Sequence, residues 1–118
     1  MSQITGKCII RLNGSELQST DDATLNVGGV NREAVVGGGK VYGYKEETVA
    51  PTLECSVAHD KNTDLVALSA TTDATIIFES DTGDKYALRG AFMTEPASLQ
   101  TTNGTASLNW SALSCERM

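Results

Sequence analysis

The sequence predicts a mainly β fold: a single-domain β-sandwich or barrel with one short flanking α-helix and a long glycine-rich loop. Three observations predict it. Apolar and polar residues alternate with a period of two, Asn-Gly and Asp-x-Gly turns separate these runs, and Thr, which suits half-exposed strands, is abundant. The 118 residues form a single domain, residues 1–118, because domains most often contain about 100–150 residues.

Five runs of alternating residues are expected to form strands. Successive side chains of a strand point to opposite faces, so the apolar set of each run should face a core. These sets are Cys8, Ile10 and Leu12; Leu25 and Val27; Leu53, Cys55 and Val57; Tyr86 and Leu88; and Leu108, Trp110 and Ala112. Pro51 indicates a strand start or an edge, because proline cannot donate to a ladder.

Short segments of turn-forming residues separate the runs. Asn13-Gly14 follows the first strand and is a strong hairpin signal. The segment Asp81-Thr82-Gly83-Asp84 predicts a tight turn with Gly83 at a positive φ angle. Asn103-Gly104 precedes the last strand.

One segment departs from the strand pattern. Residues Asn62–Ala70 contain capping residues followed by Leu65 and Leu68, which lie one helical turn apart. This spacing predicts a short helix of about two turns, although another short strand is the alternative.

The segment from Gly28 to Gly43 is rich in glycine, with six among its 16 residues. It is expected to be either a long mobile loop or an extended hairpin between two strands. Loops longer than about 12–15 residues in a small domain are usually functional or disordered.

The charge balance argues against several classes of partner. Nine basic and fifteen acidic residues give a formal net charge of −6, and the bases are scattered along the chain. Binding a nucleic-acid backbone or an anionic membrane requires clustered Lys and Arg, so neither is expected as a primary task. The N-terminal residues lack the apolar core of a secretory signal, and no segment is apolar enough to cross a membrane.

The residues that could carry chemistry do not form a recognisable catalytic, metal or cofactor site. The glycine-rich segment fails both the phosphate-loop and the dinucleotide patterns. His59 lacks a clear nucleophile partner, and the carboxylates are expected to form a solvated acidic face. Cys8, Cys55 and Cys115 have no metal-ligand spacing, which predicts three reduced, buried thiols.

The chain as a whole resembles the tail tube proteins of contractile-tailed phages. The segment from Asp73 to Phe92 carries most of the match, through the Asp81-Thr82-Gly83 turn, Tyr86 and the run Arg89-Gly90-Ala91-Phe92. The short helix before it, and the Thr94-Glu95-Pro96 turn and closing GTASLNWSA strand after it, agree in order.

The resemblance implies a structural subunit, not an enzyme. Such subunits form hexameric rings that stack into a tube within a sheath, and DNA passes through the lumen without specific binding. In relatives a long loop reaches the neighbouring ring, which assigns inter-ring contacts to Arg32, Glu33, Val35, Val36 and Lys40. An acidic wall would repel phosphates, and Glu46, Glu47 and Glu79 are the acids expected to face the lumen.

The expected partners are further copies of the chain, the tail sheath, and baseplate or tail-terminator proteins. The expected location is the virion tail after synthesis in the host cytoplasm. Two alternatives remain at this point. One is a tube protein of a type VI secretion or tailocin-like injection machine, and the other is a monomeric β-sandwich binding module.

Overall fold

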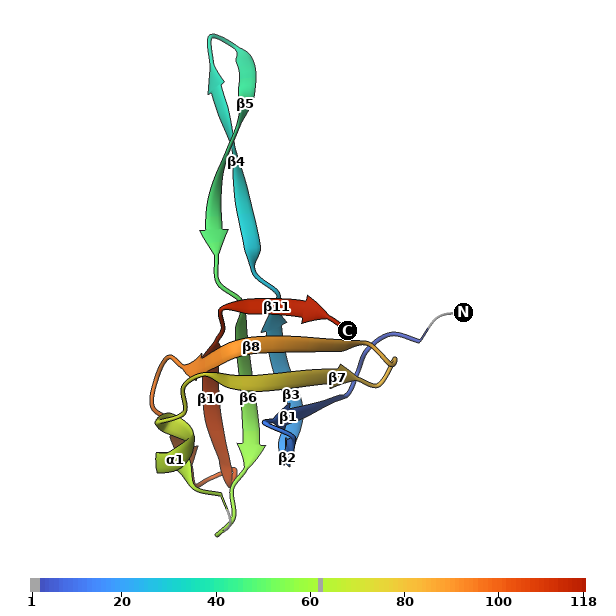
Figure 1. Ribbon diagram of the computed structural model, residues 1–118, viewed down its shortest axis with the longest axis vertical. Helices are drawn as coiled ribbons and strands as arrows, with labels where there is room; N and C mark the ends of the chain where they lie inside the picture. Colours follow the sequence, from blue (N-terminus) through green and yellow to red (C-terminus); the bar gives the residue numbers. More distant parts are fainter. Residues whose placement is uncertain (1–2, 62) are drawn as a thin grey trace.

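The computed structural model describes residues 3–61 and 63–118 (Figure 1). The strands in this part of the chain are β1 (Cys8–Leu12), β2 (Ser15–Leu17), β3 (Ser19–Asn26), β4 (Gly29–Gly37), β5 (Lys40–Val49), β6 (Thr52–Ala58), β7 (Ala74–Ser80), β8 (Lys85–Met93), β9 (Ser98–Gln100), β10 (Thr105–Ser111) and β11 (Ser114–Arg117). A single short helix, α1 (Leu65–Ser69), interrupts them within the described residues. The mainly β fold with one small helix is therefore confirmed.

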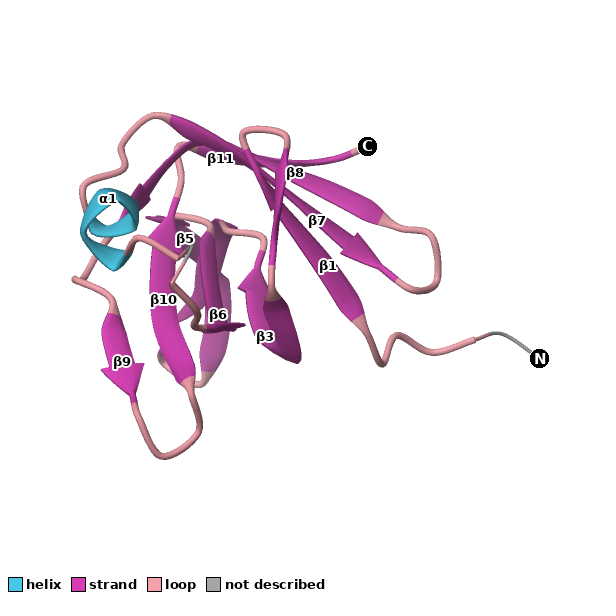
Figure 2. Cartoon of the chain, turned by 90° about the horizontal axis from the view of Figure 1, so that it is seen from below, coloured by secondary structure: helices cyan, strands magenta, loops and turns pink. Residues whose placement is uncertain are grey.

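Nine strands form one antiparallel, nearly closed sheet, called the body below. Its order is β2-β1-β7-β8-β10-β6-β3, with β11 paired to β8 and β9 paired to β10. Strand β3 returns into contact with β1, which brings the two ends of the sheet near each other. Figure 2 shows β10, β6 and β3 in one layer and β1, β7 and β8 in a second, as a barrel-like sandwich requires.

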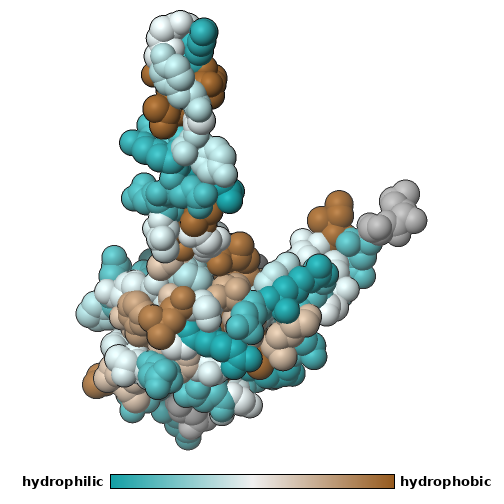
Figure 3. Space-filling model, turned by 45° about the horizontal axis from the view of Figure 1, so that its top comes forward, coloured by the Kyte–Doolittle hydropathy of each residue, from teal (hydrophilic) through white to brown (hydrophobic). Residues whose placement is uncertain are grey.

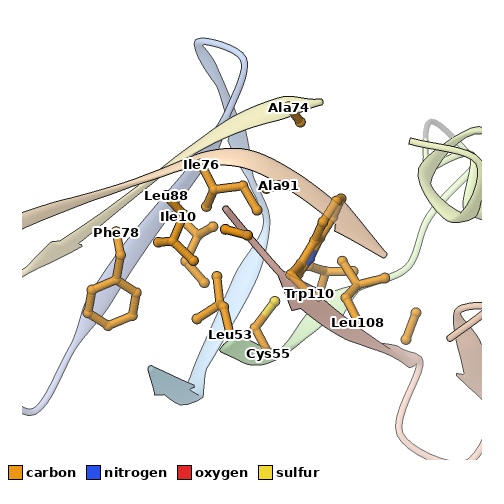
Figure 4. Close-up of a cluster of buried hydrophobic side chains, with 13 residues drawn as sticks. Ile10, Leu53, Cys55, Ala74, Ile76, Phe78, Leu88, Ala91, Leu108 and Trp110 are labelled. Carbon is orange, nitrogen blue, oxygen red and sulfur yellow. The ribbon is translucent and has the colours of Figure 1, made fainter. Parts of the chain in front are cut away.

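The core lies between these two layers and is built from the alternating residues of the sequence. Trp110, Leu108 and Leu53 point inward from one layer, and Ile10, Ile76 and Leu88 meet them from the other (Figure 4). All six are 0 or 1% exposed. Removing apolar surface from water stabilises a fold by about 25 cal/mol per Å², so the burial of these side chains is the main stabilising term here.

The predicted turns are present with the expected backbone. Asn13 and Gly14 have φ angles of 50° and 88° and join β1 to β2, as a two-residue hairpin requires. Gly83, between β7 and β8, has φ 99°, and Gly104, before β10, has φ 65°. Pro51 directly precedes β6, so its missing N–H leaves the ladder of that strand intact.

The predicted helix is present but is shorter than two full turns. Asp64 is its N-cap, and the Asp64 Oδ1 atom accepts hydrogen bonds from the backbone N–H groups of Val66 and Ala67, both at 3.1 Å. Leu65 and Leu68 pack against the core from one side. Asn62, the first residue of the predicted segment, lies outside the described residues.

The glycine-rich segment is an extended hairpin, not an irregular loop. Its two strands, β4 and β5, form a separate two-stranded sheet that projects from the body (Figure 1). The prediction that Val27 faces the core is wrong, since its side chain is 51% exposed. Strand β3 ends one residue earlier, where Asn26 Oδ1 accepts a hydrogen bond from Gly28 N at 2.9 Å and turns the chain toward the projection.

Gly28 sits where the projection joins the body and is expected to tolerate no side chain. Its φ is 73°, and a Cβ placed there would lie 2.7 Å from Pro51 N and 2.8 Å from Val49 O, both backbone atoms. We expect Gly28→Ala to lower the free energy of unfolding by about 1–3 kcal/mol through this strain. Gly6→Ala is the matched control, because nothing lies within 4 Å of its Cβ position. Equal denaturant midpoints for the two variants would contradict this prediction.

Candidate functional site

The projecting hairpin, called the arm below, comprises residues 29–49. Its β4 strand has nine residues, which at about 3.3 Å per residue gives a reach of roughly 30 Å. Nearly every arm residue is exposed, and the molecule measures 62 Å along its longest axis but only 28 Å along its shortest. A two-stranded hairpin in water is marginally stable at best. The arm is therefore a structure that a partner would stabilise.

The far end of the arm, called the tip below, comprises residues 35–44 and is apolar. Val36, Val41 and Tyr42 are 66–69% exposed, and Val35 and Tyr44 are also exposed. Lys40 is the one charged residue in this stretch of sequence. Figure 3 shows hydrophobic side chains on the upper arm and hydrophilic ones below them. Exposed apolar groups gathered in this way typically mark a contact surface.

The lower arm, called the stem below, comprises residues 29–34 and 45–49. It carries oppositely charged side chains that pair across its two strands. Lys45 Nζ lies 3.3 Å from Glu33 Oε2, and Arg32 Nε lies 3.9 Å from Glu46 Oε1. The Arg32 guanidinium also lies over the Tyr44 ring, 5.6 Å from its centroid. Such exposed pairs add little stability, but they set the register of the ribbon.

The arm is electrically neutral although the chain is acidic. Its three bases, Arg32, Lys40 and Lys45, balance its three acids, Glu33, Glu46 and Glu47. The whole formal charge of −6 is therefore carried by the other residues. A neutral arm can approach an acidic body of another copy without net repulsion.

All five residues assigned to inter-ring contact lie on the arm. Arg32, Glu33, Val35 and Val36 are on β4, and Lys40 begins β5. The sequence could only group these residues as one glycine-rich segment, and the structure places them along the two strands of one projecting hairpin. Whether they touch a neighbouring ring stays a prediction.

The three acids assigned to the lumen do not lie together. Glu46 and Glu47 are consecutive residues of the stem, so their side chains point to opposite faces of the ribbon. Across the ribbon, Glu46 is paired with Arg32 and Glu47 with Asn31. Glu79 is on β7 of the body, where its carboxylate pairs with Arg11 and, at 3.5 Å, with Lys85 Nζ. These two cations neutralise most of the negative potential that the Glu79 carboxylate would otherwise produce.

A pocket lies at the end of the body opposite the arm. It holds about 380 Å³ between α1, β2 and the end of β6. Its apolar lining includes Leu17, Val57, Ala67 and Leu68, and its acidic residues are Glu16, Asp60 and Asp64. Lys61, next to Asp60, is not among the lining residues. The pocket therefore combines apolar side chains with three acids and with the polar side chains of Gln18, Thr63 and Thr71.

Sequence reasoning missed this pocket and part of the tip. The pocket combines residues 16–18 with residues between Val57 and Thr71, two parts of the chain that are far apart in sequence, so no local pattern could show it. The apolar tip residues Val41, Tyr42 and Tyr44 were visible in the sequence as a cluster around Gly43, but they could be placed only once the segment was known to be a hairpin.

Within residues 3–61 and 63–118, no cluster of three His, Cys, Asp or Glu side chains could hold a metal ion. None of the three cysteines, all of which lie within the described residues, forms a disulfide. Cys55 is buried, whereas Cys8 and Cys115 are only partly so, and burial raises the pKa of the Cys55 thiol to about 12. Helix α1, the one helix of the described residues, has five residues and is far too short to cross a bilayer.

Two distant structures have the same fold. The chain superposes on a protein from the cryo-EM structure of the anti-feeding prophage cap, the tube-terminating cap, with a TM-score of 0.66, 14% identity and coverage of 100% of this chain and 91% of that one. It superposes on Hcp1 from Flavobacterium johnsoniae with a TM-score of 0.61, 10% identity and 94% coverage of both chains. At these identities the likeness is one of fold alone.

Sequence comparison identifies the family. The family model described as "Phage tail tube protein" matches residues 1–117. The Mu-like prophage FluMu tail tube protein of Haemophilus influenzae is 39% identical over 117 residues, covering 99% of this chain and 98% of that protein. The tail tube protein of Escherichia phage Mu is 32% identical over 94 residues, covering 80% and 79%. The chain therefore belongs to the phage tail tube protein family, whose members are structural components of the phage tail.

Proposed function

We propose that this chain is the repeating subunit of a tail tube, in which six copies form a ring and the rings stack around a lumen through which DNA is ejected. The observation that carries the proposal is the arm, which is exposed, apolar at its tip and unsupported by the body. Such a ribbon is marginal alone and gains stability by burying its tip in a neighbour. Contacts through Arg32, Glu33, Val35, Val36 and Lys40 would then join successive rings.

The charge of the body suits a channel for DNA. If six copies form a ring, it carries six times −6, or −36, formal charges. An acidic wall repels phosphates, so DNA would pass without being held. Glu46, Glu47 and Glu79 are the acids that we propose for the lumen wall. Because Glu46 and Glu47 point to opposite faces of the ribbon, only one of these two faces the lumen in a given placement of the arm. Glu79 is the weakest contributor because Arg11 and Lys85 pair with it.

The same proposal extends to partners and location. The tube would lie inside a tail sheath and end at baseplate and tail-terminator proteins, within a virion tail assembled in the host cytoplasm. A tube of a type VI secretion or tailocin-like machine is the second candidate, and it is favoured by the fold shared with Hcp1 and the anti-feeding prophage cap. The 39% and 32% identical relatives, from a Mu-like prophage and from phage Mu, favour the phage tail.

The proposal predicts visible self-assembly. Purified protein at high concentration should form rings or hollow tubes in negative-stain electron microscopy, and mass measurement in solution should show species that are multiples of six chains. A monomer at every concentration, even in the presence of its tail partners, would contradict it. Specific binding to a glycan array by that monomer would instead revive the binding-module alternative.

A further inference from the structure

We propose that the pocket between α1, β2 and β6 is the receptor for the arm tip of a second copy of this chain. The inference rests on the proposed tube function and names the surface to which the arm binds. The partner is thus the same protein, and the contact is head-to-tail.

The placement of the two surfaces supports the pairing. The arm leaves the body next to Thr52, the first residue of β6, and β6 then runs through the body to Ala58, which lines the pocket (Figure 1). The tip and the pocket thus lie at opposite ends of one molecule. Two different surfaces at opposite ends form a heterologous contact that does not close on itself, so it repeats along an axis.

The chemistry of the two surfaces is complementary. The tip presents Val36, Val41 and Tyr42 to solvent together with one charge, Lys40. The pocket has a volume of about 380 Å³, and its lining combines apolar side chains with three acids. The apolar side chains would fill the hollow while the Lys40 ammonium meets the carboxylates of Glu16 and Asp60. Asp64 already caps α1, and its charge adds to the same field.

Helix α1 provides one variant that should block the pocket and one matched control. Ala67 is exposed and lines the pocket, whereas its neighbour Val66 is 81% exposed and does not line it. We expect Ala67→Trp to fill the pocket and abolish tube growth, while Val66→Trp adds the same indole and assembles like the unmodified chain. Circular dichroism and thermal melting of both variants verify the fold. Normal tubes from Ala67→Trp, or loss of assembly in both variants, would overturn the proposal.

Charge reversal tests the polar part of the contact without filling the pocket. Lys40→Glu should raise the concentration needed for assembly by roughly tenfold, since it replaces an attraction by a repulsion at each contact. Combining Lys40→Glu with Asp60→Lys should restore most of that loss, whereas combining it with Glu95→Lys, outside the pocket, should not. Equal assembly of the two combinations would overturn the pairing.

Mixing separates this inference from the proposed function. A variant without the arm retains its pocket, and Ala67→Trp retains its arm, so a ring of one should bind a ring of the other through one layer of tip–pocket contacts and grow no further. If the unmodified protein forms tubes but this mixture forms no complex, the pocket assignment fails and the tube function stands. If the unmodified protein forms no tubes, both fail.

Discussion

Deleting the arm, residues 29–49, is expected to leave a folded body that forms no tubes. The arm forms a sheet of its own, and the core contains none of its residues. The chain ends left by the deletion are close, because Gly28 lies against the backbone of Pro51. The melting temperature of the body should therefore change by less than about 5 °C, which corresponds to roughly 1 kcal/mol in a small domain.

A milder variant separates the chemistry of the tip from the presence of the arm. Changing Val36 and Val41 to Thr and Tyr42 to Ser keeps the length of the ribbon and replaces its three most exposed large apolar side chains. Electron microscopy and sedimentation should show loss of tubes for this variant and for the deletion. Normal tubes from either one would contradict the role given to the arm.

Truncating Leu108 to Ala is expected to have the largest effect on stability. Its side chain is fully buried between the two layers, next to Trp110 (Figure 4). Leu→Ala changes in a packed core cost about 2–5 kcal/mol, because transfer free energy is lost and a cavity is left. That is a large part of the 5–15 kcal/mol of a typical domain. Trp110, the only Trp in the chain, reports unfolding by fluorescence.

The control for this variant is Leu113→Ala. Leu113 has the same side chain but is 81% exposed, so its truncation should change the free energy of unfolding by no more than about 0.5 kcal/mol. Similar denaturant midpoints for Leu108→Ala and Leu113→Ala would show that the core is not where the structure places it.

Much of the body follows from local patterns in the sequence. Residues 53, 55 and 57 alternate inward on β6, and 108 and 110 do so on β10, because a buried face imposes period two on a strand. The turns at Asn13-Gly14 and Gly83 follow from residues that tolerate positive φ. The capping residues before Leu65 predicted the helix, and the structure shows that Asp64 is the one that caps it.

The remaining features depend on contacts that no local pattern contains. The arm has no buried face, so its strands lack the alternation of apolar and polar residues that identified the others, and its glycines suggested a loop. The pocket depends on how α1, β2 and the end of β6 are placed around it, and β2 is far from the other two in sequence. The failed prediction for Val27 has a local cause, since the Asn26 side chain ends β3 one residue earlier.

A cryo-EM reconstruction of tubes grown from the purified chain tests the central claim most directly. It should show stacked rings in which the tip of each arm, residues 35–44, is seated between α1 and β6 of a copy in the next ring, with Lys40 near Asp60. Tubes in which the arm contacts only copies of its own ring, or lies free in solvent, would contradict it.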